Sequence, residues 1–536
     1  MNDISKARDI SKARKAHLIG GGIAGLAAAA YLIKDGGLLG ANITVYEEGG
    51  VMGGALDASG AAEKGYSMRG ERMYEPNYVC LYDLLSFIPS SDDPAKSIKQ
   101  DMFEFVDEFH WNNKARLVDK EGKVANFHNF GFDERDRLDI VAFTSEPESM
   151  FEDKRITDVF AEHFFKTNFW YMWQSTFGFE PWHSAIEMRR YMLRFMHLFS
   201  VMPTQSGLYR TRYNQYDSMI RPIKKWLGDQ GVRFVPKTRA TDIDIGSDPS
   251  EITATRIVMI QDGKQKEVVV EAGDIVLVTI GSMVADSSLG SNSSAPELIT
   301  TKKDGAFALW ETLAKGRKDL GNPSVFSGHI DEAKWESFTV TSKDPLFYQR
   351  IEQLTGNEAG RNGMVTLKDS SWLLTISTYH QPQYIDQPKD VSVWWGYGLY
   401  PDKIGDYVRK PMSQCSGSEI LEETLRQLKW DSDLKRIRDS AIVIPCMMPY
   451  ITSMFLKRKT GDRPNVVPKG STNFGLLGQF VEVPDDTVFT VEYSVRTAQI
   501  AVFKLLKLAR EPLPFPRVSN DVRVLWNAFK AMHAVA

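Results

Sequence analysis

Residues 20–25 near the start of the chain, Gly-Gly-Gly-Ile-Ala-Gly, have the types and spacing of a phosphate-binding turn. They follow an apolar run and lead into an alanine-rich stretch at 26–32. In a strand, turn and helix of this kind, Gly20 permits a tight bend and Gly22 lets the backbone approach a pyrophosphate, while Gly25 lets the helix lie close to the sheet. The chemistry that this segment indicates is dinucleotide binding.

An acidic residue follows at the position that such a site requires. Residues 43–46 are typical of a second strand, and the strand ends at Glu47, 22 residues after Gly25. A carboxylate there accepts hydrogen bonds from ribose hydroxyls. The alternative is a glycine turn without a ligand, but the acid at this distance favours a dinucleotide site.

The elements that must position this turn are scattered along the chain. Further strand patterns lie at 231–235, 274–280 and 473–478, with helix-like stretches at 216–227 and 487–507. We therefore predict an α/β protein with a discontinuous Rossmann-like nucleotide-binding lobe, an inserted substrate lobe and a helical C-terminal region. The predicted boundaries are 1–75, 211–290 and 455–510 for the nucleotide lobe, 76–210 and 291–454 for the substrate lobe, and 511–536 for the C-terminal segment.

Both insertions are rich in aromatic residues. The first has them at helical spacing between Phe164 and Phe199, which is more typical of a core than of a ligand pocket. The second has strand-like aromatic segments at 371–377 and 391–398, which can form either the wall of an apolar cavity or a core. Residues 521–532, after a proline-rich stretch, are apolar near helical spacing, and we favour packing on the protein over contact with a membrane surface.

Composition excludes several classes of protein. The chain has 536 residues and a formal net charge of −4, with no charged block that indicates nucleic acid. Three widely spaced cysteines, Cys80, Cys415 and Cys446, form no metal or disulfide pattern and favour a reducing, cytoplasmic location. The N-terminal repeat at 3–14 is polar, unlike a secretory signal, and no apolar run is long enough for a membrane-spanning helix.

Six separated blocks of the chain resemble one enzyme family, the oleate hydratases or fatty-acid hydratases, once called myosin-cross-reactive antigens. The resemblance implies bound FAD and addition of water across the cis-9 double bond of oleic acid, giving 10-hydroxystearic acid with no net change in oxidation state. The matching blocks are 18–30, 68–70, 214–218, 449–453, 461–464, and 478–482 continuing to 491–496.

The resemblance also implies which residues bind FAD. The glycine turn and the acid after the second strand would hold the adenosine half, and later glycines would follow the phosphates and the flavin. The implied cofactor residues are Gly20, Gly22, Ala24, Gly25, Glu47, Glu48, Gly53, Gly54, Arg69, Gly70, Gly281, Ser282, Gly478, Gln479, Phe480, Thr490 and Val491.

The segment after Arg69 departs from the family pattern. The family reads Arg-Gly-Gly-Arg-Glu-Met, and its glutamate handles the proton of the attacking water; here Met73 occupies that position. A thioether cannot transfer a proton. Glu71 and Glu75 flank the position, and we favour Glu71 as its replacement because it is next to Gly70. The alternative is that both carboxylates are solvated loop charges.

The family tyrosine that protonates the alkene corresponds to Tyr191. Arg189 and Arg190 precede it and can lower the pKa of its phenol, provided that one of them points into the cavity. Tyr216 is the second candidate. The alternative for Tyr191 is ordinary packing and hydrogen bonding in a core.

The family holds the substrate carboxylate near a Thr-Val-Asn-Arg-Gln-Pro-His segment, which reads Ser-Thr-Tyr-His-Gln-Pro-Gln at 377–383. Because two polar positions differ, the length, placement or affinity of the substrate can differ from that of other members. His380 is the nearby group expected to add positive charge, and only when protonated. The implied substrate residues are Thr378, Tyr379, His380, Gln383 and Tyr384.

Two other functions share the same nucleotide lobe. One is an FAD-dependent oxidoreductase of the amine-oxidase or desaturase type that acts on a lipid. The other is a protein that binds FAD and fatty acid but has lost the chemistry, which the methionine at position 73 permits. We predict a long-chain unsaturated fatty acid as partner, no nucleic acid, possible peripheral membrane contact, and a monomer or homodimer.

Overall fold

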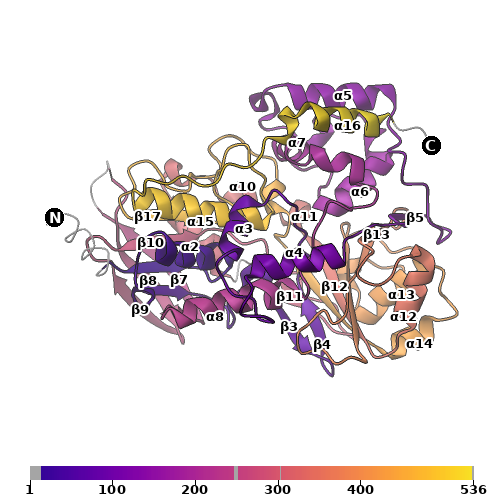
Figure 1. The fold of residues 1–536 in the computed structure, drawn as a ribbon, viewed down its shortest axis with the longest axis horizontal. Helices are drawn as coiled ribbons and strands as arrows, with labels where there is room; N and C mark the ends of the chain where they lie inside the picture. The colour runs from indigo at the N-terminus through magenta and orange to yellow at the C-terminus, as the bar shows by residue number, and fades with distance from the viewer. Residues whose placement is uncertain (1–13, 247–250, 302–303, 534–536) are drawn as a thin grey trace.

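The computed structural model describes residues 14–246, 251–301 and 304–533 (Figure 1). Most of the N-terminal repeat at 3–14 lies outside these residues. A five-stranded sheet, in the order β17-β10-β1-β2-β6, runs parallel throughout. Its central strands are continuous buried apolar runs, as expected for a sheet covered on both faces. Its strands are β1 (Ala16–Ile19), β2 (Ile43–Tyr46), β6 (Arg233–Val235), β10 (Ile275–Thr279) and β17 (Phe474–Leu477).

This sheet confirms the predicted α/β class and a strand in each of the three later sequence patterns. Helices α2 (Ile23–Lys34) and α15 (Val491–Leu505) pack against each other on it. The stretch at 216–227 begins as a π-helical turn (Tyr216–Ile220) and continues as α8 (Arg221–Asp229). A three-stranded sheet follows, made of β7 (Thr238–Ile245), β8 (Ala254–Gln261) and β9 (Lys264–Val269).

A second, seven-stranded sheet has the order β11-β16-β12-β15-β14-β13-β5. A hairpin, β3 (Ala58–Ala61) with β4 (Gly65–Met68), packs on β12, so the chain between Gly54 and Glu71 joins the two sheets. The strands of the large sheet are β5 (Leu117–Val118), β11 (Ser288–Leu289), β12 (Trp335–Ser342), β13 (Met364–Leu367), β14 (Leu374–Thr378), β15 (Ser392–Gly398) and β16 (Ala441–Met448).

Helices cover both sheets and form a separate group at one end of the molecule (Figure 1). The remaining helices are α3 (Val79–Leu85), α4 (Ile98–Glu108), α5 (Glu134–Ser145), α6 (Asn168–Phe177), α7 (Ala185–Arg194), α9 (Gly305–Ala314), α10 (Ser324–Ser327), α11 (Ile330–Ala333), α12 (Leu346–Thr355), α13 (Gly417–Gln427), α14 (Leu434–Asp439) and α16 (Val522–Met532).

The aromatic residues of the first insertion form part of the main core. Phe164, Trp170 and Trp173 are at most 1% exposed and belong to one buried apolar cluster. Tyr191 and Phe199 belong to the same cluster. The core interpretation of these aromatics is therefore confirmed.

The C-terminal helix α16 packs through one face. Ala528 and Met532 are buried, and the backbone oxygen of Met532 accepts a hydrogen bond from Arg137 of α5. Figure 1 shows α16, in yellow, lying along α5 and α7. The opposite face is open, because Val522 and Trp526 are 75% and 59% exposed.

A buried cluster of charges joins the first insertion to the late part of the chain. Glu187 of α7 pairs with Arg458 and Arg463, at 2.7 and 3.0 Å. Arg190 and Arg458 both pair with Glu482. Burial opposes ionisation of Glu187, but the surrounding guanidinium groups outweigh it and lower the pKa of Glu187 to about 2.

Candidate functional site

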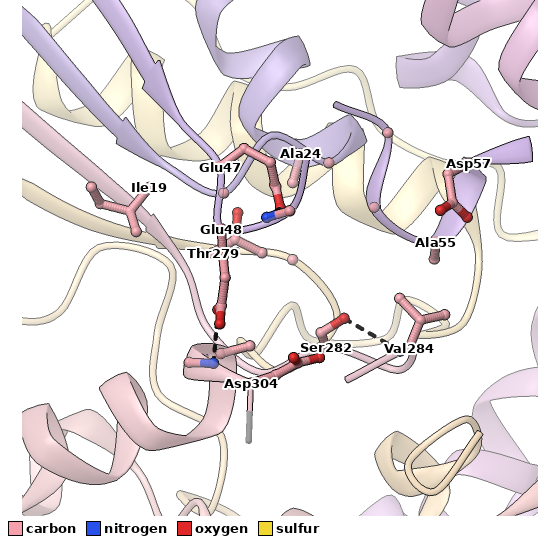
Figure 2. A pocket seen from close by; sticks show the side chains of 18 of the residues that line it. Ile19, Ala24, Glu47, Glu48, Ala55, Asp57, Thr279, Ser282, Val284 and Asp304 are labelled. Carbon is pink, nitrogen blue, oxygen red and sulfur yellow. Dashed lines mark hydrogen bonds between the residues drawn. The ribbon is translucent and has the colours of Figure 1, made fainter. Parts of the chain in front are cut away.

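A cavity of about 980 Å³ opens at the carboxyl ends of the parallel strands, beside the glycine turn (Figure 2). All of the predicted cofactor residues line it except Gly25 and Gly70. They come from the turn at 20–24, the segment at 47–54, the residue after β4, the segments after β10 and β17, and the start of α15. The structure therefore brings together six separate stretches of the sequence.

The glycines of the turn are required by close approach. Gly20 has a φ of +103°, and a Cβ there would lie 2.9 Å from Thr279. A Cβ on Gly25 would lie 2.1 Å from the carbonyl oxygen of Gly20, so only glycine lets α2 begin this close to β1. The N-terminus of α2 has no side-chain cap and no acidic residue in its first turn. Its amides can therefore meet an anion in the cavity.

The two acidic residues after β2 have different partners. Glu47 accepts hydrogen bonds from the backbone amides of Gly21 and Gly49, at 2.8 and 2.7 Å, which hold it at the turn. Glu48 accepts from the amide of Gly305, at the start of α9, and pairs with Arg239 (Figure 2). Burial raises the pKa of Glu48 above its ordinary value. Each oxygen of Glu47 retains a second lone pair for a ribose hydroxyl.

Sequence reasoning missed several residues of this cavity. One is Asp57, which pairs at 2.8 Å with the predicted residue Arg69; both line the cavity. Arg72 donates to the carbonyl of Ala55 and lies over the ring of Phe489. The hydroxyl of Thr279 is buried in the wall without a hydrogen-bond partner. A sequence signal was present only for Arg72, which lies next to the family's catalytic position.

A second, much smaller cavity of about 20 Å³ adjoins the loop after β4. It has room for about one water molecule. Its lining combines charged and aromatic side chains from five distant segments. These include Glu71, Phe105, Trp111, Arg210, Arg212, Gln215, Tyr379, His380 and Gln383.

Glu71 and Arg210 form the centre of the second cavity. The two side chains form an ion pair, and their exposed fractions are only 3% and 9%. The second oxygen of Glu71 accepts a hydrogen bond of 2.5 Å from the hydroxyl of Ser377. Glu71 is thus a bound carboxylate, and its interpretation as a solvated loop charge is wrong.

Arg210 is held on all sides. Its guanidinium lies 3.9 Å from the ring centre of Trp111 and 4.7 Å from that of Tyr379. It also donates to the hydroxyl of Ser377 and the carbonyl of Thr378. Ser377 and Thr378 belong to β14, so Arg210 connects this strand to the loop that carries Glu71.

The other two positions in the segment that departs from the family pattern, Met73 and Glu75, lie outside the second cavity. Met73 is half-buried and packs against the main apolar cluster. The carboxylate of Glu75 is buried between Arg194 and His197, at 3.2 and 3.3 Å, and lines neither of the two cavities. The interpretation of Glu75 as a solvated loop charge is therefore also wrong.

Tyr191 is buried among aromatic rings, and its hydroxyl donates a hydrogen bond of 2.5 Å to the carbonyl of Val488. The expected activation by neighbouring arginines does not occur. Arg190 pairs with Glu148 and Glu482, Arg189 reaches the carbonyl of Thr144, and desolvation raises the pKa of Tyr191 well above its ordinary value. The helix turns both arginines away from the phenol.

Tyr216 begins the π-helical turn and is half-buried, with its ring against Gly53. It therefore lies behind the wall of the first cavity. Burial raises the pKa of its phenol. The charge of Arg221 opposes this effect but does not outweigh it.

The segment predicted to hold a carboxylate is divided. Tyr379, His380 and Gln383 line the second cavity, and Thr378 contributes its carbonyl to Arg210, whereas Tyr384 stacks on Tyr66 with ring centres 4.2 Å apart. The expectation that His380 is the cation of this region is wrong. Desolvation lowers the pKa of His380, which keeps it neutral at pH 7, and the tertiary fold supplies Arg210 instead.

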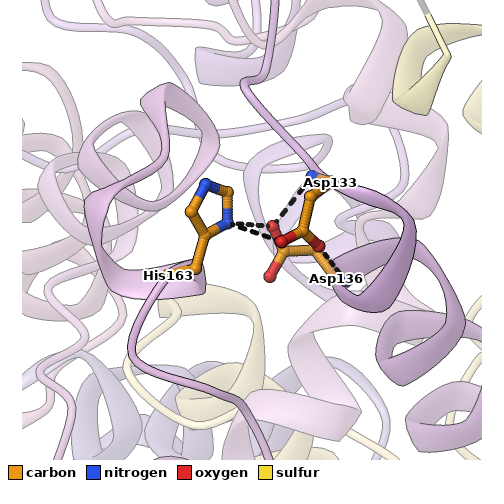
Figure 3. Close-up of side chains that lie close together, drawn as sticks. All are labelled: Asp133, Asp136 and His163. Carbon is orange, nitrogen blue, oxygen red and sulfur yellow. Dashed lines mark hydrogen bonds and ion pairs between the residues drawn. The ribbon is translucent and has the colours of Figure 1, made fainter.

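One further group of potential ligands lies at the start of α5 (Figure 3). Asp133, Asp136 and His163 have ligand atoms within 4.8 Å of one another. Asp133 and Asp136 form a capping box, and His163 lies 2.7 Å from the carboxylate of Asp136. Helix capping and this pair account for the arrangement.

The three cysteines are buried and free of disulfides. Within the part of the chain that the structure describes, no helix combines the length and apolarity needed to cross a bilayer. The reducing location remains a prediction.

The parallel sheet and its covering helices define an α/β protein of the Rossmann type, with the first cavity at the carboxyl ends of the strands. Solved structures share this fold at low sequence identity. An oxidoreductase from Methanosarcina mazei has a TM-score of 0.50 and 11% identity, covering 92% of this chain and 100% of its own. Cyclohexylamine oxidase from Brevibacterium oxydans has a TM-score of 0.51 and 12% identity, covering 92% and 99%.

Sequence comparison places the chain more narrowly. The MCRA family matches residues 13–503, and the chain belongs to that family. An oleate hydratase of Streptococcus pyogenes serotype M49 is 36% identical over 96% of this chain and 89% of its own length. A linoleate hydratase of Lactiplantibacillus plantarum is 34% identical over 97% and 98%.

Proposed function

We propose that this protein is a fatty-acid hydratase that adds water across the cis-9 double bond of oleic acid to give 10-hydroxystearic acid. The observation that carries the proposal is the similarity to two hydratases along nearly the entire chain. The oxidoreductase and the oxidase among the solved structures share only the fold, at 12% identity or less. Chemistry is therefore inferred from the family rather than from the fold.

We propose FAD as the resident cofactor of the first cavity. The cavity has the volume of a large ligand site and the uncapped N-terminus of α2 at one side. The buried hydroxyl of Thr279, which has no partner, suits a polar group of such a ligand. Glu47 would accept from the ribose, and Gly53, Gly281 and Gly478 leave room for the rest. When bound, a reduced flavin supplies an electron-rich neighbour for positive charge on carbon.

The protein residues must supply a proton and keep bulk water away from the positive charge that forms on carbon. Tyr191 is the acid: its phenol transfers a proton to one alkene carbon, and the cation that forms on the other carbon is shielded by the aromatic rings around it. A water molecule then forms the new C–O bond, and the proton that it loses returns to the Tyr191 phenolate left by the first step. An alkyloxonium ion is a very strong acid, so this last step needs no dedicated carboxylate. That accounts for Met73 at the family's glutamate position.

The second cavity would receive the head group of the fatty acid. Arg210, Gln215, Tyr379 and Gln383 place polar groups there. Burial of the acyl chain supplies the affinity, at about 0.8 kcal/mol for each methylene before the costs of association. A fixed head group then decides which carbons meet Tyr191.

The test is to incubate the purified protein with reduced FAD and oleate in ¹⁸O-labelled water and to analyse the product by mass spectrometry. Label on C10 of a hydroxystearate supports the proposal. An unsaturated or keto product would replace it with the lipid oxidoreductase. Unchanged oleate that is nevertheless bound would replace it with a binding protein.

The exposed face of α16 supports peripheral contact with a membrane surface. Val522, Trp526 and Phe529 project from it next to Arg523. Co-sedimentation with anionic vesicles measures this contact. Replacement of Trp526 and Phe529 by serine should reduce the bound fraction without changing the fold.

A further inference from the structure

The second cavity already contains a carboxylate that belongs to the protein. Glu71 projects into it, and its two oxygens are bound by Arg210 and Ser377. The free space that remains holds about one water. A substrate carboxylate therefore has no room beside Glu71 in this arrangement.

The cations around the cavity are already paired. Arg210 directs its guanidinium nitrogens to Glu71, Ser377 and Thr378. Arg212 lies 3.4 Å from Asp101 and 3.9 Å from Asp92.

The remaining basic groups do not offer a charge to the cavity either. Arg72 lines both cavities, but its guanidinium is engaged: it donates to the carbonyl oxygens of Ala55 and Glu71 and to the sulfur of Met283, and it lies over the ring of Phe489. His380 packs against Phe105 and Phe109. Arg210 is therefore the cation that a second carboxylate would have to share.

We propose that Glu71 determines head-group specificity by competing with the substrate carboxylate for Arg210. This inference rests on the proposed function, because it takes the second cavity as the head-group site. A fatty acid binds only when its carboxylate displaces that of Glu71. A lipid with an uncharged polar head, such as a fatty alcohol, has no such competitor. Glu71 thus weakens binding of fatty acids relative to fatty alcohols of the same chain.

The physical reason is the cost of leaving a buried charge unpaired. Two carboxylates cannot share one guanidinium and one hydroxyl in a closed space without repulsion. Displaced Glu71 must find water or another donor, and that cost is subtracted from the affinity for the fatty acid. Removing Glu71 leaves Arg210 buried without a negatively charged partner, a site that favours a ligand carboxylate.

The experiment measures binding by calorimetry, using oleate and oleyl alcohol below their aggregation concentrations, with the FAD-loaded protein. We expect Glu71→Ala to tighten oleate binding at least tenfold and to change oleyl alcohol binding less than threefold. Glu71→Gln, which keeps the size of the side chain but replaces one acceptor oxygen by an NH2 donor, should tighten oleate binding by a smaller factor. Because that variant leaves no void in the cavity, it keeps the test valid if Glu71→Ala does not fold.

Two controls identify Arg210 as the contested group. The double variant Glu71→Ala with Arg210→Met should lose the gain in oleate affinity. Glu63→Ala, an exposed carboxylate in the β3–β4 turn, should leave both affinities unchanged.

Equal or weaker oleate binding by both Glu71 variants would overturn the inference. So would a hundredfold loss of turnover at unchanged affinity, because Glu71 would then act in the chemistry. Failure of the proposed function looks different: oleate binds to the unaltered protein but no hydroxystearate forms.

Discussion

The two cavities of this protein are built from different parts of the polypeptide. The first presents mainly backbone, because glycines at 20, 22, 53, 54, 281 and 478 line it. The second presents side chains, chiefly Arg210, Glu71 and the aromatic rings that enclose them. The first is large and carries an uncapped helix N-terminus, whereas the second is nearly filled by its own ion pair.

The difference shows how each cavity selects its ligand. A backbone site recognises phosphates through amides and a helix N-terminus, which are the same in every sequence that can form the turn. A side-chain site recognises a head group through charges that one substitution can add or remove. We therefore expect the first cavity to be sensitive to steric change and the second to changes of charge.

The largest effect is expected from Gly25→Ala in the first cavity. Its Cβ would lie 2.1 Å from the carbonyl oxygen of Gly20, so the turn must deform and α2 must move. FAD affinity, measured by titration of flavin fluorescence, should fall at least a hundredfold. The matched control is Gly228→Ala in α8, where a Cβ meets no neighbour, and flavin affinity should not change. Normal flavin binding by the Gly25 variant would show that the first cavity does not depend on close approach of the backbone at this glycine.

Substitution of the proposed acid, which lies among aromatic rings outside the walls of both cavities, should have the next largest effect. Tyr191→Phe keeps the ring contacts but removes the proton, so turnover of oleate should fall about a hundredfold or more. Tyr216→Phe should change turnover less than about threefold, since its ring only supports Gly53. Product formation by gas chromatography measures both. If the Tyr216 variant loses more turnover than the Tyr191 variant, the roles are reversed.

Acid should weaken the buried charge cluster that joins α7 to the late part of the chain. The pKa of Glu187 is about 2 in the folded protein, below its ordinary value of 4.5. The stabilisation that ionised Glu187 gives the folded protein is complete above pH 4.5 and is lost as the pH falls toward 2. At pH 3 the loss amounts to about 2 kcal/mol of the free energy of unfolding. Urea unfolding between pH 3 and 6 measures the loss. Glu187→Gln should have a flatter pH profile over this range, and an unchanged slope would contradict the assignment.

The smallest effect concerns the helix that borders the first cavity. Thr490 caps α15 by accepting a hydrogen bond of 3.1 Å from the amide of Tyr493. Thr490→Ala should lower the free energy of unfolding by about 1 kcal/mol. Thr490→Ser keeps the hydroxyl and should restore most of it. Thermal unfolding monitored by circular dichroism compares the three proteins, and equal stabilities would show that the cap contributes nothing.

Local patterns predicted the first cavity well. The turn at 20–25, the strand before Glu47 and the strand at 274–280 are short apolar or glycine-rich segments whose conformation depends on nearby residues. The parallel order of these strands then brings their carboxyl ends to one edge. That is why residues such as Ser282 and Gln479 could be assigned to the same groove as Gly20.

The second cavity could not be predicted in the same way. Arg210 and Glu71 are 139 positions apart, and Ser377 lies 167 positions beyond Arg210. Nothing local distinguishes Arg210 from the arginines at 189 and 190, which were expected to serve Tyr191 and instead pair with other groups. An arginine has a long side chain, so its partner depends on which distant segment the fold places within reach.

By itself, the sequence determined the family, the α/β class and the residues of the nucleotide turn, because these depend on spacing and on glycine geometry. Only the tertiary structure decided that Glu71 is a buried partner of Arg210, that Glu75 faces Arg194 and His197, and that His380 is not the cation of its pocket. Charge pairing and desolvation depend on what surrounds a group in space. Neither quantity exists until distant segments of the chain have come together.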